Sequence, residues 1–164
     1  MNEIGWRYGW VTVLALFLAV VFQPLVYDWL SIGIYVPDTI LITMLCCSLM
    51  SNRSTGAFLG FVAGFLYSAT VVGKTIPEFC ISMSAAGFWA GWVPVWIRRE
   101  YIFTAVLVVF SGTIIAETTF LLLHPGNLMF VSWMKATFIK AVYNGVIAIP
   151  TYALLKRFVP QAIS

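Results

Sequence analysis

Residues 135–157 read KATFIKAVYNGVIAIPTYALLKR, and this stretch indicates the class of fold. It is long enough to cross a bilayer at about 1.5 Å per helical residue. It nevertheless carries Lys140, Asn144, Gly145 and Pro150 inside an otherwise apolar run. An ammonium group in the middle of a bilayer costs about 2.5 kcal/mol or more unless it reaches the interface or finds a partner. The stretch therefore predicts a membrane helix whose polar side chains meet partners elsewhere in the chain.

The composition is that of an integral membrane protein. Of the 164 residues, 62% are hydrophobic and 9% are charged, and the mean hydropathy is +0.97. Soluble globular domains do not reach such values. Apolar runs alternate with short polar joints, so residues 1–164 are predicted to form a single transmembrane domain in the lipid bilayer. The net charge of +3 is small and spread over the joints, which argues against a nucleic-acid partner.

The sequence shows no pattern typical of a catalytic or metal site. Its one histidine, His124, is followed by Pro-Gly, which favours a turn. The cysteines lack the CxxC spacing and the histidine cluster that zinc or redox chemistry needs, so packing roles are expected for Cys46, Cys47 and Cys80. We therefore predict a non-enzymatic protein without catalytic residues, metal ligands or cofactors. A proton path through Asp38 and Glu117 is the alternative.

Six membrane spans are predicted from the apolar runs, at residues of about 10–27, 34–50, 55–72, 77–97, 101–123 and 135–157. Pro37 suits the first turn of the second span, where the missing N–H of proline costs nothing. Pro94 predicts a kink near the end of the fourth span. The predicted fold class is therefore an all-α integral membrane protein, a six-transmembrane-helix bundle.

Three glycines of the third span are predicted to form a helix-packing face. Gly56, Gly60 and Gly64 recur at four-residue spacing, which places them on one side of a helix. Without side chains, this face lets another backbone approach closely. We expect general packing within the bundle rather than a dedicated dimer motif.

The distribution of basic residues predicts the orientation in the membrane. With six crossings, the two ends of the chain and two joints share one side, which holds Arg7, Arg53, Arg98, Arg99, Lys156 and Arg157. The opposite side holds only Lys74 and Lys135. Because basic residues accumulate on the cytoplasmic face, both termini are predicted to be cytoplasmic.

The charged residues inside the spans are predicted to form one polar cluster in the outer third of the bundle. The fifth span travels outward and the sixth returns, so Glu117 and Lys140 lie at similar depth on antiparallel helices. Asp38, at the outer start of the second span, lies at comparable height, and Asn144 is one turn deeper on the Lys140 face. The alternative is that Lys140 and Asp38 reach the interface on their own and only Glu117 needs a partner.

Three stretches together resemble MreD, a family of bacterial rod shape-determining membrane proteins. Residues 35–43, YVPDTILIT, are similar to the family's proline-led segment. Residues 56–69, GAFLGFVAGFLYSA, are similar to its glycine-rich helix, and residues 144–158, NGVIAIPTYALLKRF, to its Asn-Gly, proline and basic ending. One position departs from the family pattern. Many members carry an aspartate after the glycine-rich helix, where this chain has Tyr67 and Ser68, so no role of that acid carries over.

The resemblance implies a non-catalytic scaffold in the bacterial cytoplasmic (inner) membrane that helps to maintain cell shape. MreD-like proteins bind MreC, a single-span periplasmic protein, within the peptidoglycan elongation complex. That complex also contains the RodA glycosyltransferase, its partner transpeptidase and the MreB cytoskeleton. A scaffold of this kind predicts that helix faces rich in small residues receive a foreign transmembrane helix.

The same resemblance implies a competing function. MreD-like proteins are similar in fold to the substrate-binding S components of energy-coupling-factor transporters. Such a component captures a vitamin-type small molecule on the outer side, where the predicted polar cluster lies. The short joints between the predicted spans leave little chain to cover such a ligand.

Overall fold

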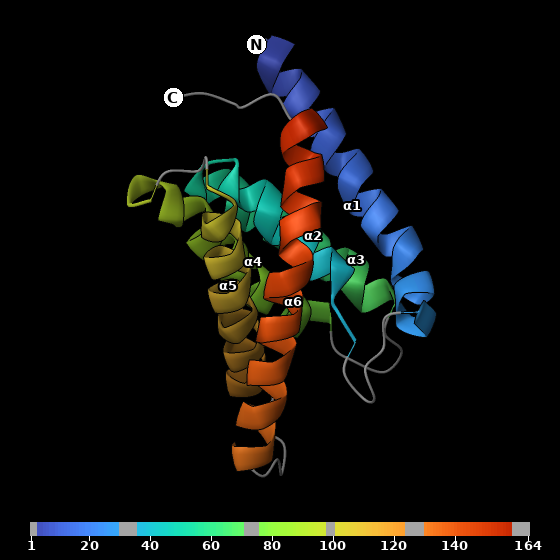
Figure 1. Ribbon diagram of the computed structural model, residues 1–164, viewed down its shortest axis with the longest axis vertical. Coiled ribbons are helices and arrows are strands. Elements are labelled where there is room, and N and C mark those ends of the chain that lie inside the picture. Colours follow the sequence, from blue (N-terminus) through green and yellow to red (C-terminus); the bar gives the residue numbers. More distant parts are fainter. Residues whose placement is uncertain (1–2, 30–35, 71–75, 98–100, 124–129, 159–164) are drawn as a thin grey trace.

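The computed structural model describes residues 3–29, 36–70, 76–97, 101–123 and 130–158. Within these ranges every regular element is helical (Figure 1). In chain order they are α1 (Glu3–Trp29), α2 (Thr39–Leu49), α3 (Arg53–Thr70), α4 (Ile76–Trp92), the 3₁₀ turn η1 (Val93–Val95), α5 (Ile102–Leu123) and α6 (Phe130–Phe158).

The core of the fold is α2. Every residue from Ile40 to Leu49 is buried, and α2 contacts α1, α3, α4, α5 and α6. Its sequence, TILITMLCCSL, is apolar on all sides, and a helix of that kind is stable only when it is enclosed. The other helices therefore surround α2.

Three helices in the described ranges are long and apolar enough to cross a membrane, which is compatible with an α-helical membrane protein. They are α5, α6 and residues Gly9–Val26 of α1. By contrast, α2 has 11 residues, and about 16 Å of helix is shorter than a hydrocarbon core of about 30 Å. Six crossings therefore stay a prediction.

Two predictions about prolines need correction. The helix of the second predicted span begins at Thr39, after non-helical residues 36–38, so Pro37 is not in its first turn. The α-helix of the fourth span ends at Trp92 and gives way to the η1 turn, whose first positions include Pro94. Proline lacks the N–H that the next α-helical hydrogen bond needs, so the helix stops there instead of continuing with a kink.

The predicted glycine face of α3 lies against α4. A Cβ on Gly56 or Gly60 would collide with the main chain at Gly87 or Met83, and one on Gly64 would lie 2.5 Å from the carbonyl oxygen of Phe79. The two helices can pack this closely only because the side chains are missing. The expectation that this face receives a foreign helix is wrong, because α4 of the same chain occupies it.

The amino end of α1 and the carboxyl end of α6 lie at the same end of the molecule (Figure 1). From there α1 and α6 diverge, and α5 runs beside α6. Four basic residues used to predict the orientation cannot be placed: Lys74, Arg98 and Arg99 lie outside the described residues, as does the side chain of Arg7.

Candidate functional site

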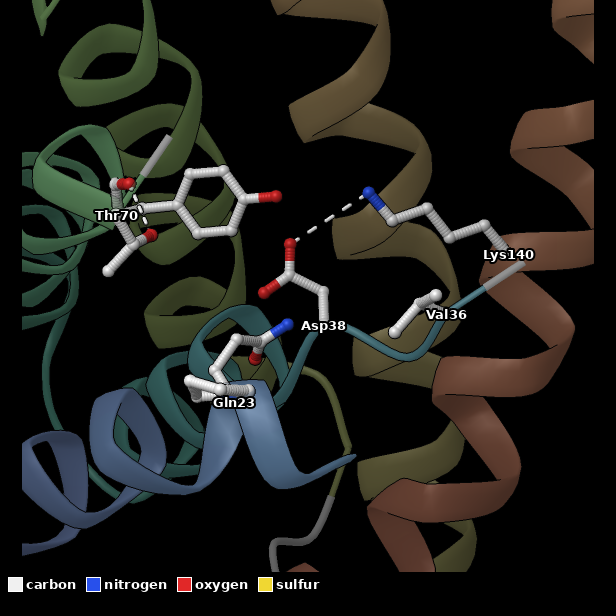
Figure 2. Close-up of a pocket in the computed structure, with 7 residues that line it drawn as sticks. Gln23, Val36, Asp38, Thr70 and Lys140 are labelled. Atoms are coloured by element: carbon white, nitrogen blue, oxygen red, sulfur yellow. Dashed lines mark hydrogen bonds and ion pairs between the residues drawn. The ribbon is translucent and has the colours of Figure 1, made fainter. Parts of the chain in front are cut away.

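Lys140 on α6 interacts with two carboxylates that come from different parts of the chain. Its Nζ atom lies 2.5 Å from Oε1 of Glu117 on α5 and 3.8 Å from Oδ2 of Asp38. The side chain of Asp38 is 5% exposed, and those of Lys140 and Glu117 are each 25% exposed. Figure 2 shows Lys140 and Asp38 pointing toward one another. The structure thus brings three of the predicted residues into one ion cluster.

Asp38 is held in place by the start of α2. It is the N-cap residue, and its Oδ1 accepts a hydrogen bond of 3.0 Å from the backbone N–H of Leu41. Its own backbone N–H donates to Oδ1 of Asn144 at 3.1 Å. N-terminal N–H groups of a helix need such acceptors because the helix supplies none. One carboxylate oxygen of Asp38 therefore caps α2 while the other faces Lys140.

Asn144 explains how a carboxamide is accommodated within an apolar helix. It is fully buried, and its Nδ2 donates to Oγ1 of Thr113 on α5 at 3.2 Å. The hydroxyl of Thr113 in turn donates to the carbonyl oxygen of Val109 at 2.7 Å. Buried polar groups are tolerated when they are hydrogen-bonded. Asn144 thereby links α6 to α5 and to the N-cap of α2.

Two site residues that sequence reasoning missed, Gln23 and Thr39, join α1 to this network. Oε1 of Gln23 accepts a 2.9 Å hydrogen bond from the backbone N–H of Thr39, and its Nε2 donates to the carbonyl oxygen of Pro37 at 3.3 Å. The hydroxyl of Thr39 also donates to Gln23. A glutamine near the end of an apolar run is a weak signal, because an interfacial position would suit it equally well.

Tyr67 on α3 is the third missed residue. It lines two cavities together with Asp38 and Lys140. Its ring lies 4.9 Å from the ring of Phe79 on α4. This is the region in which the family resemblance leads one to expect an aspartate. Tyr67 therefore places a phenol in the walls of the cavities beside Asp38 and Lys140.

Two cavities flank the ion cluster. The larger, of ≈ 300 Å³, is lined by Gln23, Asp38, Tyr67, Thr70 and Lys140 together with Pro24 and Val36 (Figure 2). The smaller, of ≈ 160 Å³, reaches Glu117 and Ser82 as well as Asp38, Tyr67 and Lys140. A water molecule occupies about 30 Å³, and polar walls of this kind can hold water or a small polar group.

An apolar groove of ≈ 490 Å³ runs between α1 and α6, and we call it the α1–α6 groove. Residues of α2 form its floor, including Thr39 and Ile42. Large apolar side chains form its walls: Leu14, Leu18 and Phe22 from α1, and Ile147, Leu154 and Phe158 from α6. Because α1 and α6 diverge, α2 is the element that connects these walls.

The described residues offer binding surfaces and fixed polar contacts. No group of three histidine, cysteine, aspartate or glutamate side chains among them could hold a metal ion. Cys46, Cys47 and Cys80 are buried. Comparison of the chain with protein-family models, curated proteins and solved structures finds no match.

Proposed function

We propose that the protein is a non-catalytic membrane scaffold of the bacterial rod-shape complex, and that it binds MreC within the peptidoglycan elongation complex. In this proposal the chain crosses the cytoplasmic membrane six times with both termini in the cytoplasm. Its fold would then be similar to that of the S components. RodA, its partner transpeptidase and the MreB cytoskeleton belong to the same complex.

The six crossings require α2 and the residues before it to act together. Residues 36–38 are non-helical, and Pro37 and Asp38 are buried. Non-helical backbone is tolerated at membrane depth when it is enclosed by protein. The segment that precedes α2 can therefore complete a crossing that 11 helical residues cannot make alone.

One observation supports the resemblance to MreD-like proteins. Two of the resembling stretches meet in the polar network, because the backbone N–H of Asp38, from residues 35–43, donates to Asn144, from residues 144–158. The stretches are far apart in the sequence, and nothing in their spacing requires that they meet. The meeting of the first and the last of them is expected if these two motifs preserve one structural site.

The binding of a single-span partner rests on the α1–α6 groove, and this observation carries the proposed function. The groove is almost wholly apolar, and the α1 side chains that line it include the exposed Leu14, Leu18 and Phe22. Helix association in a bilayer is driven by van der Waals packing and shape, since lipid is as apolar as the helix surface. A groove of ≈ 490 Å³ between two diverging helices offers a third helix such packing.

A vitamin-type S component is the second candidate function. The ≈ 300 Å³ cavity beside Asp38 and Lys140 favours it, because its walls offer both donors and acceptors to a small polar ligand. The two candidates predict different co-purifying molecules. MreC without a small molecule supports the scaffold, and a stoichiometric vitamin supports the S component.

The decisive experiment co-expresses the full chain with MreC of the same organism and measures the MreC that is retained after affinity purification in mild detergent. Leu14→Trp fills the groove and should release MreC. Val13→Trp is the matched control, because Val13 is 59% exposed and Leu14 58% exposed, yet only Leu14 lines the groove. Retention of MreC by both variants, or by neither, would contradict the proposed docking site. Absence of MreC from the unmodified chain would contradict the proposed function.

A further inference from the structure

The ion cluster carries more negative than positive charge. Among the described residues it contains two carboxylates, Asp38 and Glu117, and one ammonium group, Lys140. The other side chains of the network, such as Asn144, Gln23 and Thr113, are uncharged amides and hydroxyls, and Tyr67 in the cavity wall is a phenol. A charge that is enclosed by protein and lipid without a counter-charge is strongly disfavoured. The cluster is therefore suited to receive one further positive charge.

Asp38 is the carboxylate with the weaker compensation. Lys140 lies 2.5 Å from Glu117 and 3.8 Å from Asp38, so its charge is placed mainly against Glu117. The Asp38 oxygen that caps α2 is already bonded to the N–H of Leu41. The remaining oxygen belongs to a side chain that lines the ≈ 300 Å³ cavity. A cation in this cavity would complete the charge balance at Asp38.

The cavity lies at one end of the α1–α6 groove. On α1 the groove reaches Phe22, and the cavity begins at the next residue, Gln23. On the α2 side, Thr39 lines the groove and Asp38 lines the cavity. Lys140 stands seven residues before Ile147 on α6, and seven residues are about two turns, which returns to the same face. All three elements thus lead from the apolar groove to the Asp38 carboxylate.

We propose that the helix bound in the α1–α6 groove carries a lysine or arginine at the end beside Asp38, and that this side chain forms an ion pair with Asp38 in the ≈ 300 Å³ cavity. The inference rests on the proposed function, because it specifies the chemistry of the partner helix. The long apolar stems of lysine and arginine can follow the groove wall while the charged group enters the cavity. A helix with a neutral or acidic end would leave Asp38 with only the 3.8 Å contact to Lys140 as its counter-charge, so the cluster selects among single-span partners by charge.

The test uses the full chain co-expressed with MreC, and retained MreC is measured over a salt series. Asp38→Asn keeps an oxygen that can cap α2 but removes the charge, and it should weaken MreC binding at least about tenfold. Lys140→Gln makes the cluster more negative and should strengthen binding, an effect that a purely structural role would not produce. Glu78→Gln is the control, because Glu78 lines neither the groove nor the cavity and its removal should leave binding unchanged.

Variants of the partner keep the inference testable if a cluster variant fails to fold. Each lysine or arginine within two turns of either end of the MreC span is replaced by glutamine. One of these replacements in MreC should weaken binding as much as Asp38→Asn does. That replacement combined with Asp38→Asn should bind no worse than either change alone.

Full retention of MreC by Asp38→Asn would overturn this inference and leave the proposed function intact. Unchanged binding by every MreC variant would also overturn this inference and leave the proposed function intact. The charge at Asp38 would then be balanced by a proton or a free ion. Loss of MreC from the unmodified chain would overturn both.

Discussion

The side chain of Asn144 accepts a hydrogen bond from the backbone N–H of Asp38, a residue 106 positions earlier in the chain. This contact joins the N-cap of the enclosed α2 to the middle of α6. Its distance of 3.1 Å is that of an ordinary N–H···O hydrogen bond. Asp38 is thus positioned by α6 as well as by the helix that it caps.

Asn144→Leu should destabilise the fold. The substitution leaves the N–H of Asp38 without its acceptor and removes a hydrogen bond to Thr113. Each buried group that loses its partner costs about 1–3 kcal/mol. We expect a clearly lower midpoint of thermal unfolding in detergent. Thr151→Val is the control, because the Thr151 hydroxyl donates within its own helix, to Ile147, and its loss should have little effect. Equal midpoints for Asn144→Leu and the unmodified chain would contradict the structural role of this contact.

Glu117→Leu should cost more than the double variant Glu117→Leu, Lys140→Leu. The single change leaves an ammonium group with only the 3.8 Å contact to Asp38, whereas the double change removes both charges of the short ion pair. Breaking one side of such a pair is expected to cost roughly 1–3 kcal/mol after allowance for its partial exposure. Unfolding midpoints of the two single variants and the double variant measure the coupling. If both residues are dispensable for stability and for MreC binding, the ion cluster has no role.

Gly60→Leu should prevent α3 from packing on α4. A Cβ at this position would collide with the carbonyl group of Met83 and lie 2.7 Å from Cα of Ser84, and neither backbone atom can move aside cheaply. We expect loss of the folded, monodisperse protein in size-exclusion chromatography. Gly9→Leu is the matched control in α1, since a Cβ there meets nothing within 4 Å. A normal elution profile for Gly60→Leu would mean that the two helices do not approach as described.

The predicted orientation can be measured with reporters at the carboxyl end. Lys156 and Arg157 in the last turn of α6 favour a cytoplasmic location under the positive-inside rule. Green fluorescent protein fused after residue 164 should fluoresce, and alkaline phosphatase at the same position should be inactive. An active phosphatase fusion would reverse the orientation and would move the ion cluster to the cytoplasmic half.

The sequence predicted the meeting of Glu117 and Lys140 better than it predicted the environment of Asp38. Two residues at equal depth on packed antiparallel helices meet when both lie on the facing sides, and these two are in contact. The capping role of Asp38 depends on where α2 begins. Pro37, directly before Asp38, could equally have opened the helix, so the sequence did not identify the first helical residue. Tyr67 and Gln23 could not be assigned to the cluster because their polar groups would also suit a membrane interface.

The course of α2 was the least predictable part of the fold. Its apolar residues read as a membrane span, since hydropathy does not distinguish burial in lipid from burial in protein. The structure shows burial in protein, because five helices contact α2. The glycines of α3 were predicted to pack against a helix, but only the structure identifies that helix as α4.

The contacts of Asp38 with α6 also set an order for biogenesis. A nascent chain that has been synthesised only as far as α5 contains Asp38 without Lys140 or Asn144, so the start of α2 lacks the groups of α6 that hold it. The amino-terminal helices can enter the membrane earlier, but their final arrangement has to wait for the helix that leaves the ribosome after them.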